Sequence, residues 1–349
     1  MDLPALRAAL EQRGISVTTP DWRDAGVDWS VVDLAVIRST WDYSLFLGQF
    51  QQWLNDVSSL TRVLNCPQVI GWNLDKKYMT ELQRRGIAVV PTVLATTVDQ
   101  AAARLAEVEA RAVVVKPTVS AGSRDTGLFT VADPAAQRLA EMVLALGKTV
   151  MIQPAIASVA AEGELALILF DGVRSHAVRK GPLLEHGGGL IGGEYTEVIA
   201  PVRPTPEQWD LAEAAAVAAV AAIGHRECCA DQSLLYARID IVTGDDGSPL
   251  VLEAELFEPS LFIDHPKGVL MPLRAQVDMS IIGKWRRADE EDVLSLDELA
   301  ESAIDLRVKL AHGLLSQRSA RVRVIRPSRL GAVVAPQRRN GPPRPLRCR

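Results

Sequence analysis

Three carboxylates and one arginine lie in a single short segment of this chain, as two pairs of residues that are each two positions apart. Arg238 and Asp240 are two residues apart, Glu253 and Glu255 are also two apart, and the sequence Gly244–Gly247 between them is typical of a turn. Side chains two apart on a strand point to the same face, so a β-hairpin would gather all four on one side of a sheet. Crowded carboxylates are costly to desolvate unless a hard cation such as Mg²⁺ binds them. The segment predicts a divalent-metal site, with a solvated polar edge hairpin as the alternative.

A lysine at the end of a second apolar run also points to phosphate chemistry. Lys116 follows Ala112-Val-Val-Val and precedes a loop that contains Ser120, Gly122 and Ser123. A lysine that ends a buried strand needs an anionic partner, and small residues let backbone N–H groups approach a phosphate closely. The spacing is neither that of a P-loop nor that of a Rossmann dinucleotide motif. Taken alone, the pattern is more typical of a surface turn than of a ligand site.

The hairpin segment resembles the metal hairpin of the ATP-grasp ligases. Its order of Arg-x-Asp, a glycine-containing turn, Leu-Glu-Ala-Glu and then Pro-Ser matches that family. The resemblance implies that Asp240, Glu253 and Glu255 bind Mg²⁺, or Mn²⁺, which bridges ATP phosphates, and that Arg238 is catalytic. The third ligand is more usually Asn in the family, so Glu255 adds a negative charge here.

Further matches follow in the chain order of the family. Lys76, Lys116 and Lys180 resemble its phosphate-contacting lysines, and Lys180 is also assigned a catalytic role. Residues 150–156 resemble the hinge that contacts adenine through backbone groups, and Glu164 resembles the ribose-binding acid. The positions that the resemblance assigns to ATP are Lys76, Lys116, Ser120, Gly122, Ser123, Gln153, Ala155, Ile156, Glu164 and Lys180. Each has an ordinary alternative as a surface or strand-end residue, but their joint order favours function.

Two loops and one further residue are predicted to contact a substrate. Loops at the carboxyl ends of parallel strands build ligand crevices, and one such loop follows the apolar run Leu34–Ile37. Its Arg38 suits a bidentate pair with a substrate carboxylate, and the neighbouring polar side chains suit polar or amine groups. A second loop, rich in glycine, is either a lid over an acyl phosphate or a plain connection. The predicted substrate residues are Arg38, Ser39, Thr40, Asp42, Gly187, Gly188 and Ser260. For the first loop, a helix start with aromatic core anchors is the alternative.

The resemblance implies a two-step ligase reaction on a small-molecule carboxylate. ATP would phosphorylate the carboxylate, and an amine on a second substrate or on the same molecule would attack the acyl phosphate. The motifs are most similar to a glutathione-synthetase-like branch that includes an O-ureido-serine cyclo-ligase. The different-class alternative is a non-catalytic ATP-binding module with a regulatory or structural role, which the presence of all three acids and Arg238 disfavours.

The elements that must position these residues predict an α/β fold composed of α+β lobes. The resemblance implies an ATP-grasp fold with a small N-terminal α/β domain. That domain begins at a helical pattern from Asp2 to Gly14, so its first strand is missing. The predicted divisions are an N-terminal domain at 1–74, the two ATP-binding lobes at 75–153 and 154–280, a helical extension at 281–317 and a disordered Arg/Pro-rich tail at 318–349.

Composition limits the remaining choices. The 349 residues are 48% hydrophobic and 23% charged, which is ordinary for a globular enzyme. No apolar run reaches the roughly 20 residues that a bilayer requires, so we expect no membrane span. The four cysteines show neither zinc spacing nor a disulfide framework, which favours a cytoplasmic protein. The tail from Arg318 holds ten arginines and no acid, leaving an acidic body that argues against nucleic acid as a partner, whereas a homo-oligomer stays open.

Overall fold

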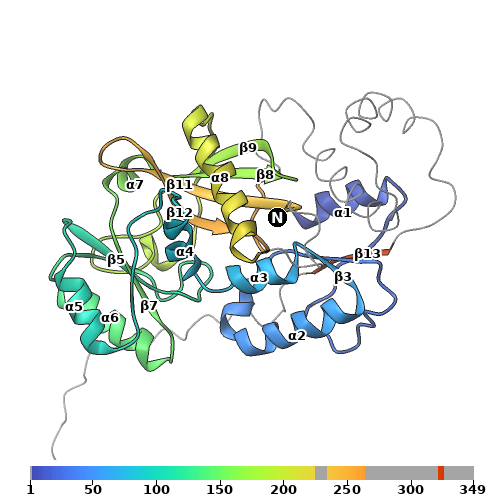
Figure 1. The fold of residues 1–349 in the computed structure, drawn as a ribbon, viewed down its shortest axis with the longest axis horizontal. Helices are drawn as coiled ribbons and strands as arrows, with labels where there is room; N and C mark the ends of the chain where they lie inside the picture. Colours follow the sequence, from blue (N-terminus) through green and yellow to red (C-terminus); the bar gives the residue numbers. More distant parts are fainter. Residues whose placement is uncertain (1, 225–233, 264–320, 326–349) are drawn as a thin grey trace, which may run out of the picture.

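The computed structural model describes residues 2–224, 234–263 and 321–325, which form three sheets with their helices. The N-terminal sheet is parallel and the other two are antiparallel, as Figure 1 shows with the N-terminal domain in blue. The expected combination of a small α/β domain and two α+β lobes is confirmed. Residues 281–317, predicted to be helical, lie outside the described chain. Among the described residues, no helix has the length and apolar composition that a membrane crossing requires.

The N-terminal sheet has four strands that run parallel to one another. In spatial order they are β1 (Ser16–Thr18), β13 (Arg321–Ile325), β2 (Leu34–Ile37) and β3 (Arg62–Leu64). The helical elements of this domain are α1 (Leu3–Glu11), the 3₁₀ helix η1 (Trp41–Leu45), α2 (Leu47–Leu60) and α3 (Pro67–Asn73). The helix α1 and the strand β2 therefore form where the hydrophobic pattern predicts them, whereas β1 is an additional strand. The strand β2 is buried throughout, as expected for a central strand of a parallel sheet.

The strand β13 corrects two expectations about the ends of the chain. It pairs with β1 on one side, where Val322 lies opposite Val17, and with β2 on the other, where Val322 lies opposite Leu34. The strand between β1 and β2 is thus a segment from the C-terminal tail, drawn in red inside the N-terminal domain in Figure 1. The prediction of disorder over 318–349 is wrong for residues 321–325, and the rest of the tail lies outside the described chain.

A four-stranded antiparallel sheet forms the first of the two lobes. Its strands in spatial order are β4 (Val93–Ala95), β7 (Val150–Pro154), β5 (Ala112–Pro117) and β6 (Gly127–Thr130). The helices α5 (Val98–Ala106) and α6 (Pro134–Ala145) contact each other and the sheet, and their apolar sides share its core. Both helices start at a side-chain cap, from Thr97 and Asp133, which satisfies a free backbone N–H in the first turn.

A five-stranded antiparallel sheet forms the second lobe. Its strands in spatial order are β10 (Ile199–Pro201), β9 (Val173–Lys180), β8 (Glu164–Phe170), β11 (Tyr236–Thr243) and β12 (Pro249–Glu255). The other elements between 157 and 222 are α7 (Ala157–Glu162), the 3₁₀ helix η2 (Ile191–Gly193) and α8 (Pro206–Ala222). α8 begins with a capping box between Thr205 and Gln208, and Gly224 takes a left-handed φ of 71° just beyond its end, as the sequence predicts.

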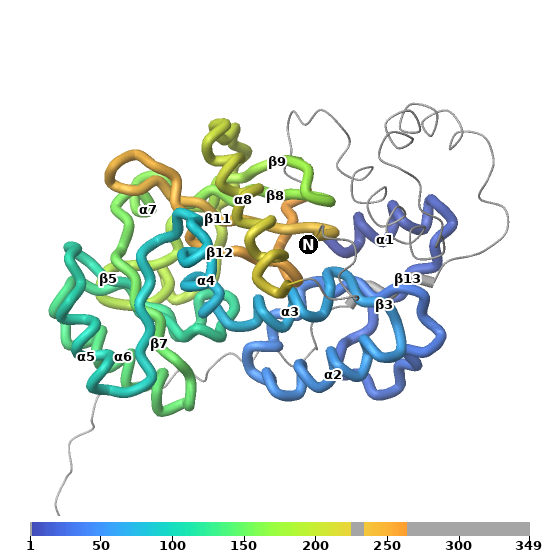
Figure 2. Tube along the Cα trace, in the orientation of Figure 1, coloured from blue at the N-terminus to red at the C-terminus, as the bar shows by residue number. Residues whose placement is uncertain are grey.

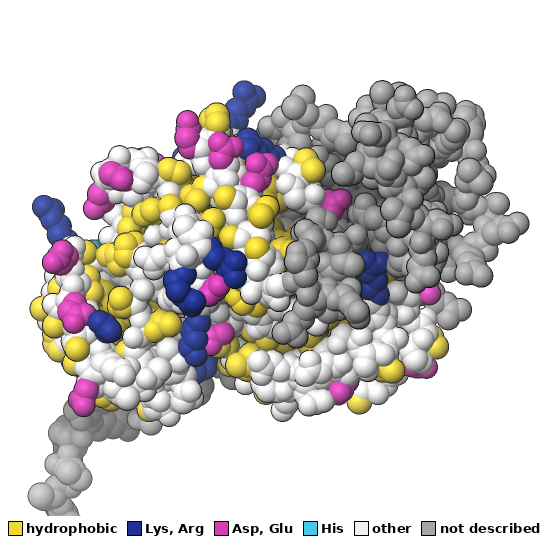
Figure 3. Space-filling view, in the orientation of Figure 1, with side chains coloured by type: hydrophobic (Ala, Val, Ile, Leu, Met, Phe, Trp, Pro, Cys, Tyr) yellow, Lys and Arg dark blue, Asp and Glu magenta, His cyan; other side chains and the backbone are white. Residues whose placement is uncertain are grey.

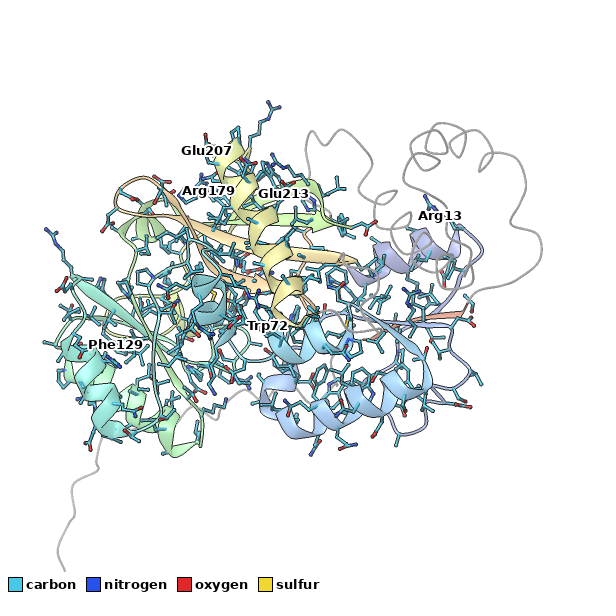
Figure 4. The ribbon with its side chains drawn as sticks, in the orientation of Figure 1. Arg13, Trp72, Phe129, Arg179, Glu207 and Glu213 are labelled. Carbon is cyan, nitrogen blue, oxygen red and sulfur yellow. The ribbon has the colours of Figure 1, made fainter. Side chains whose placement is uncertain are left out.

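Helix packing fixes the five-stranded sheet to the rest of the molecule. The helix α8 shares one core with the sheet and with α4 (Tyr78–Arg84), and Trp72 packs against this core. Figure 4 shows Trp72 near one end of α8 and Glu207 near the other, and Glu213 belongs to the middle of the helix. The Trp72 ring lies 5.0 Å from the Tyr78 ring, while Glu213 pairs with Arg174 of β9 at 2.7 Å. The strands that carry site residues are therefore held from behind by a helix.

A second core joins the N-terminal sheet to the five-stranded sheet. It contains Leu10 and Val36 from the first domain with Ile168 and Phe170 from β8. The tube in Figure 2 shows α1 lying beside the end of this sheet. On the face drawn in Figure 3, several basic side chains lie beside acidic ones.

The cysteine pattern predicts no disulfide, and this expectation is wrong for Cys66. That residue is disulfide-bonded. Cys228, Cys229 and Cys348 all lie outside the described residues. The cysteines therefore do not indicate a reducing compartment.

Candidate active site

The predicted hairpin is present and places its charged residues opposite one another. β11 and β12 pair antiparallel, with Arg238 opposite Glu255 and Asp240 opposite Glu253. The register shifts between Asp240 and Ile241, an irregularity of the kind that re-aims side chains beside functional sites. Alternation along the two arms, together with this register, brings the four charged side chains to the same face of the sheet.

Arg238 is held by two acids of the hairpin. Its Nε and Nη2 donate to the two oxygens of Asp240 at 2.8 and 2.9 Å, a bidentate pair, and Nη2 also donates to Glu255. The arginine is 5% exposed. Burial opposes its charge, but Asp240 and Glu255 more than offset this and hold the pKa of Arg238 above its usual value. The guanidinium is therefore charged and fixed in direction.

Lys180 joins the hairpin to the start of β8. Its Nζ lies 2.7 Å from an oxygen of Glu164 and 2.8 Å from one of Asp240. Burial lowers the pKa of Lys180, but the nearby carboxylates of Asp240 and Glu164 raise it by more than burial lowers it. The net shift of the pKa is therefore upward. Burial raises the pKa of Glu164 even though Lys180 opposes that change. Two residues predicted from separate motifs, one for phosphate and one for ribose, are thus in direct contact.

Lys76 contacts both the hairpin and the small-residue loop that follows β5. Its Nζ lies 3.1 Å from Glu253 and donates to the carbonyl of Ser120 at 2.7 Å, while its backbone N–H donates to Thr118 at 2.8 Å. Burial lowers the pKa of Lys76, and Glu253 reverses this to give a raised pKa. The lysine therefore ties the small-residue loop to the arm of the hairpin that carries Glu253.

Lys116 differs from the other cations of the site. It ends β5 as predicted, and no acid of the described chain lies within ion-pair distance of it. Burial lowers its pKa, although Glu253 opposes the shift. A half-buried lysine that lacks an acidic partner is suited to bind an anionic ligand.

These side chains line one cavity of about 1100 Å³ between the two antiparallel sheets. Its size suits a nucleotide with a small substrate. Most predicted residues lie in its wall: Asp42, Lys76, Lys116, Ser120, Gly122, Ser123, Gln153, Ala155, Ile156, Glu164, Lys180, Arg238, Glu253, Glu255 and Ser260. In the small-residue loop, Gly122 and Ser123 have left-handed φ angles of 63° and 54°, a conformation that is costly for serine and recurs where loops bind ligands.

The three predicted metal ligands divide into two groups. Glu253 and Glu255 line the cavity, whereas Asp240 is 1% exposed and lies behind Arg238 and Lys180. Burial, opposed by Arg238 and reinforced by the nearby acids, raises the pKa of Glu255 to about 7. Within the described ranges, no three His, Cys, Asp or Glu side chains are arranged to enclose a metal ion. The crowded oxygen donors nevertheless fit a hard cation such as Mg²⁺, which would relieve their repulsion.

Comparisons with known proteins identify the family. A model for the N-terminal domain of D-cycloserine synthetase DcsG matches residues 1–65. The cycloserine biosynthesis protein DcsG of Streptomyces lavendulae is 38% identical over 268 residues, which cover 74% of this chain and 87% of that protein. The chain belongs to the DcsG family of ATP-grasp ligases.

Solved structures agree with this assignment. The crystal structure of D-cycloserine synthetase DcsG matches with a TM-score of 0.74 and 33% identity, over 81% of this chain and 94% of that one. The ATP-grasp ligase PsnB with its minimal precursor matches with a TM-score of 0.54 and 18% identity, over 80% and 94% of the two chains, which shows the shared fold. Membership of the DcsG family favours a ligase over the non-catalytic ATP-binding module.

The DcsG-family chain uses Arg38 differently from the prediction. Arg38 does not line the cavity and is fully buried. Its Nη2 donates to Asp2 at 3.1 Å and to the carbonyl of Pro259 at 2.5 Å, and its guanidinium lies 4.8 Å from the Tyr236 ring centre. The adjacent Ser39 and Thr40 also lie outside the cavity wall. Arg38 thus contacts the chain next to Ser260 through Nη2, while its Nε and Nη1 have no hydrogen-bond partner among the described residues, and its role toward a substrate stays a prediction.

The glycine-rich loop of the DcsG-family chain rests on the first lobe. Gly187 donates to the carbonyl of Leu128 at 2.8 Å, and Leu128 donates to that of Gly188 at 3.0 Å. These two glycines do not line the cavity, but His186 and Ile191 on either side of them do. The loop therefore bridges from the second lobe to β6 across the cavity, a position compatible with the predicted lid.

Glu258 and Trp41 are polar cavity residues of the DcsG-family chain that the sequence does not predict as site residues. Glu258 lines the cavity and is only 7% exposed, and Trp41 donates its indole N–H to the Glu258 carbonyl at 3.0 Å. Burial, with Glu255 nearby, raises the pKa of Glu258 to about 8. The available signal is a charged residue between the apolar pairs Leu256-Phe257 and Leu261-Phe262.

Proposed function

We propose that this ligase binds Mg²⁺–ATP in the cavity and activates the carboxylate of a small amino-acid-like substrate as an acyl phosphate. The observation that carries the proposal is the convergence of Lys76, Lys116, Lys180 and Arg238 on one cavity wall. Phosphoryl transfer depends mainly on positioning and on charge neutralisation, so it needs such cations rather than a nucleophile and a base.

The proposed roles follow the walls of the cavity. Lys116 and Lys180 contact phosphate oxygens, and the loop around Gly122 covers the triphosphate. Glu253 and Glu255 hold Mg²⁺, which when bound would neutralise charge on the phosphates. Arg238, fixed by Asp240, stabilises the phosphoryl group in transfer.

The nucleoside would lie at the opposite end of the cavity. Gln153, Ala155 and Ile156 line the cavity where β7 ends and form the proposed adenine-binding hinge. The N–H of Ala155 is already bonded to the Ala112 carbonyl at 2.9 Å, so other backbone groups of this hinge must contact the base. Glu164 is placed to accept a bond from a ribose hydroxyl.

We further propose O-ureidoserine as the substrate, on the basis of the family. The related Streptomyces lavendulae protein is named for cycloserine biosynthesis, and the related structure is named D-cycloserine synthetase. ATP would transfer its γ-phosphoryl group to the substrate carboxylate and leave as ADP. The nitrogen bonded to the side-chain oxygen would then attack the acyl carbon, forming the C–N bond and closing the ring. The C–O bond to phosphate breaks, and phosphate and a proton leave.

Isotope transfer tests this reaction directly. With O-ureidoserine labelled by ¹⁸O in its carboxylate, one label should appear in the released phosphate, because a carboxylate oxygen leaves with phosphorus. Label in AMP would show adenylate chemistry instead. Unlabelled phosphate formed together with ADP would show simple ATP hydrolysis, and either result would reject the proposed mechanism.

A further inference from the structure

Glu258 is a buried acid of the cavity whose carboxylate has no hydrogen-bond or ion-pair partner among the described residues. Glu164 pairs with Lys180, Glu253 with Lys76 and Glu255 with Arg238. Within residues 2–224, 234–263 and 321–325, no hydrogen-bond donor or cation pairs with the Glu258 carboxylate, although the residue is only 7% exposed. A buried carboxylate that faces a cavity without a partner is costly unless a bound group supplies the positive charge.

The backbone around Glu258 is held firmly in place. Its carbonyl accepts from the Trp41 indole at 3.0 Å, and the next carbonyl, of Pro259, accepts from the buried Arg38. Asp2, which pairs with Arg38, also accepts from the N–H of Leu261 at 2.7 Å. The position of Glu258 in the cavity wall is thus fixed from both sides.

The neighbours of Glu258 place it at the end of the cavity formed by the N-terminal domain. Trp41 and Asp42 belong to η1, and Ser260 follows Glu258 in the chain, and all three line the same cavity. The lysines assigned to phosphate belong instead to the two antiparallel sheets or to the segment before α4. The wall of Trp41, Asp42 and Glu258 therefore faces the substrate side rather than the nucleotide side.

The chemistry of this wall favours an ammonium group over a metal ion. A carboxylate gives a charge-assisted hydrogen bond to an ammonium, and an indole face attracts the same cation. Trp41 is 38% exposed and lines the cavity, so it is within reach of a ligand. Asp42 adds a second carboxylate, one oxygen of which accepts from the Trp22 indole at 3.0 Å. An indole is not a ligand for Mg²⁺, which prefers oxygen donors.

We propose that Glu258, with Trp41 and Asp42, binds the α-ammonium group of an amino-acid substrate and selects for it. The choice of ligand rests on the proposed function. Binding the ammonium at the N-terminal wall would direct the carboxylate of the same substrate toward Arg238 and the phosphates. Glu258 is in this view a substrate-binding residue that sets specificity.

Calorimetric binding to the full chain in the presence of Mg²⁺–ADP tests the proposal without requiring turnover. The two ligands are O-ureidoserine and 3-(ureidooxy)propanoate, which lacks only the α-amine. The unchanged protein should bind the amine-bearing ligand at least about tenfold more tightly, the scale of a partly buried ion pair. Glu258→Gln should remove this preference. Glu197→Gln is the matched control, because Glu197 is a half-buried acid of the same cavity that already accepts a hydrogen bond from the Tyr195 hydroxyl.

A preference that survives in Glu258→Gln, or that is absent from the unchanged protein, overturns the proposal. A loss of Mg²⁺ affinity in Glu258→Gln with the amine preference intact would make Glu258 a metal ligand and overturns it as well. Trp41→Leu, which should weaken the preference several-fold, provides a second test if Glu258→Gln does not fold. The release of ADP from ATP during turnover is measured in a separate assay. If the protein binds the amine-bearing ligand selectively but releases no ADP, only the proposed reaction is rejected. If it releases ADP but shows no selectivity for the amine, only the ammonium site is rejected.

Discussion

The five-stranded sheet and the N-terminal sheet are assembled from opposite kinds of contact. In the five-stranded sheet, β8 pairs with β9 and β11 pairs with β12, so each hairpin closes within a short stretch of chain. In the N-terminal sheet, β13 lies between β1 and β2 and comes from the far end of the chain. Pairing between neighbouring strands costs little loop-closure entropy. Pairing with a distant strand costs more, and the contacts of that strand in the sheet must offset the cost.

The hairpin with the charged site residues is therefore built locally, whereas the N-terminal sheet is completed by a distant segment of the chain. The hairpin that carries Arg238 and the acids can form from its own sequence, with α8 behind it. The N-terminal domain, which supplies Trp41 and Asp42 to the cavity, depends on a strand that its own 65-residue family match does not contain. Changes to the hairpin should therefore alter turnover, and changes to the tail should alter stability.

The largest effect should come from Glu253→Gln in the hairpin. Loss of this carboxylate removes a proposed metal ligand and the partner of Lys76, so we expect kcat to fall roughly 100- to 1000-fold. The local hairpin should keep its structure, so the melting temperature should change by no more than about 2 °C. Steady-state ADP release and thermal unfolding measure the two quantities. Asp245→Asn, on the exposed turn of the same hairpin, is the control and should leave both unchanged. Near-normal turnover in Glu253→Gln would rule out the metal assignment.

The next largest effect should come from removing β13. A truncation that ends at Gln317 deletes a strand bonded on both sides, and we expect the melting temperature to fall by about 5 °C or more. A truncation that ends at Ile325 keeps the strand and serves as the matched control, with an expected change within about 1 °C. Thermal unfolding of the two proteins under the same conditions makes the comparison. Equal melting temperatures would show that the N-terminal sheet is stable without its distant strand.

What the sequence predicts correctly follows the same division. The hairpin could be predicted because strand alternation and a glycine turn are local signals, and so could Lys116 at the end of β5. The strand β13 could not, because five residues in an arginine-rich tail give no sign of which sheet will accept them. Arg-Val-Arg-Val-Ile does alternate, but alternation alone does not name a partner strand.

The surroundings of Arg38 could not be predicted from the sequence for the same reason. Arg38 has the side chain and the position of a carboxylate-binding residue, yet its partners Asp2 and Pro259 are 36 and 221 residues away in the chain. No local pattern shows that these groups occupy the space beneath it. The sequence does not indicate Glu258 for the converse reason, because its significance comes from the lack of a partner in a cavity between the two antiparallel sheets and η1.

A smaller effect should come from Asp2→Asn, which tests whether Arg38 is structural. Asp2 accepts from Arg38 at 3.1 Å and from Leu261 at 2.7 Å, and both side chains are buried. Removing the negative charge leaves a buried guanidinium without compensation, which costs about 3 kcal/mol. Denaturant unfolding should show this loss. Arg7→Gln, which breaks the exposed α1 pair with Glu11, is the control and should cost less than about 1 kcal/mol. An unchanged stability in Asp2→Asn together with weaker substrate binding would return Arg38 to the substrate site.

The smallest effect should appear at His176, where β9 meets the N-terminal domain. Its Nε2 lies 2.8 Å from the Leu261 carbonyl, and burial lowers its pKa to about 4, although that carbonyl and Asp2 oppose the shift. The unfolded chain therefore takes up a proton near the usual pKa of about 6.5, while the folded protein does not until about 4. Because the unfolded state binds more protons in this window, stability is lost as the pH falls.

Between pH 6.5 and 5.5 the loss from this group should be about 1 kcal/mol. His176→Gln keeps an amide donor for Leu261 and should remove that part of the pH dependence, as measured by denaturant unfolding at the two pH values. His186→Gln, at an exposed histidine, is the control and should leave the dependence as it is in the unchanged protein. The same slope in all three proteins would mean that His176 is not kept neutral by its burial, and that the contact between the two sheets is more open to water than the structure shows.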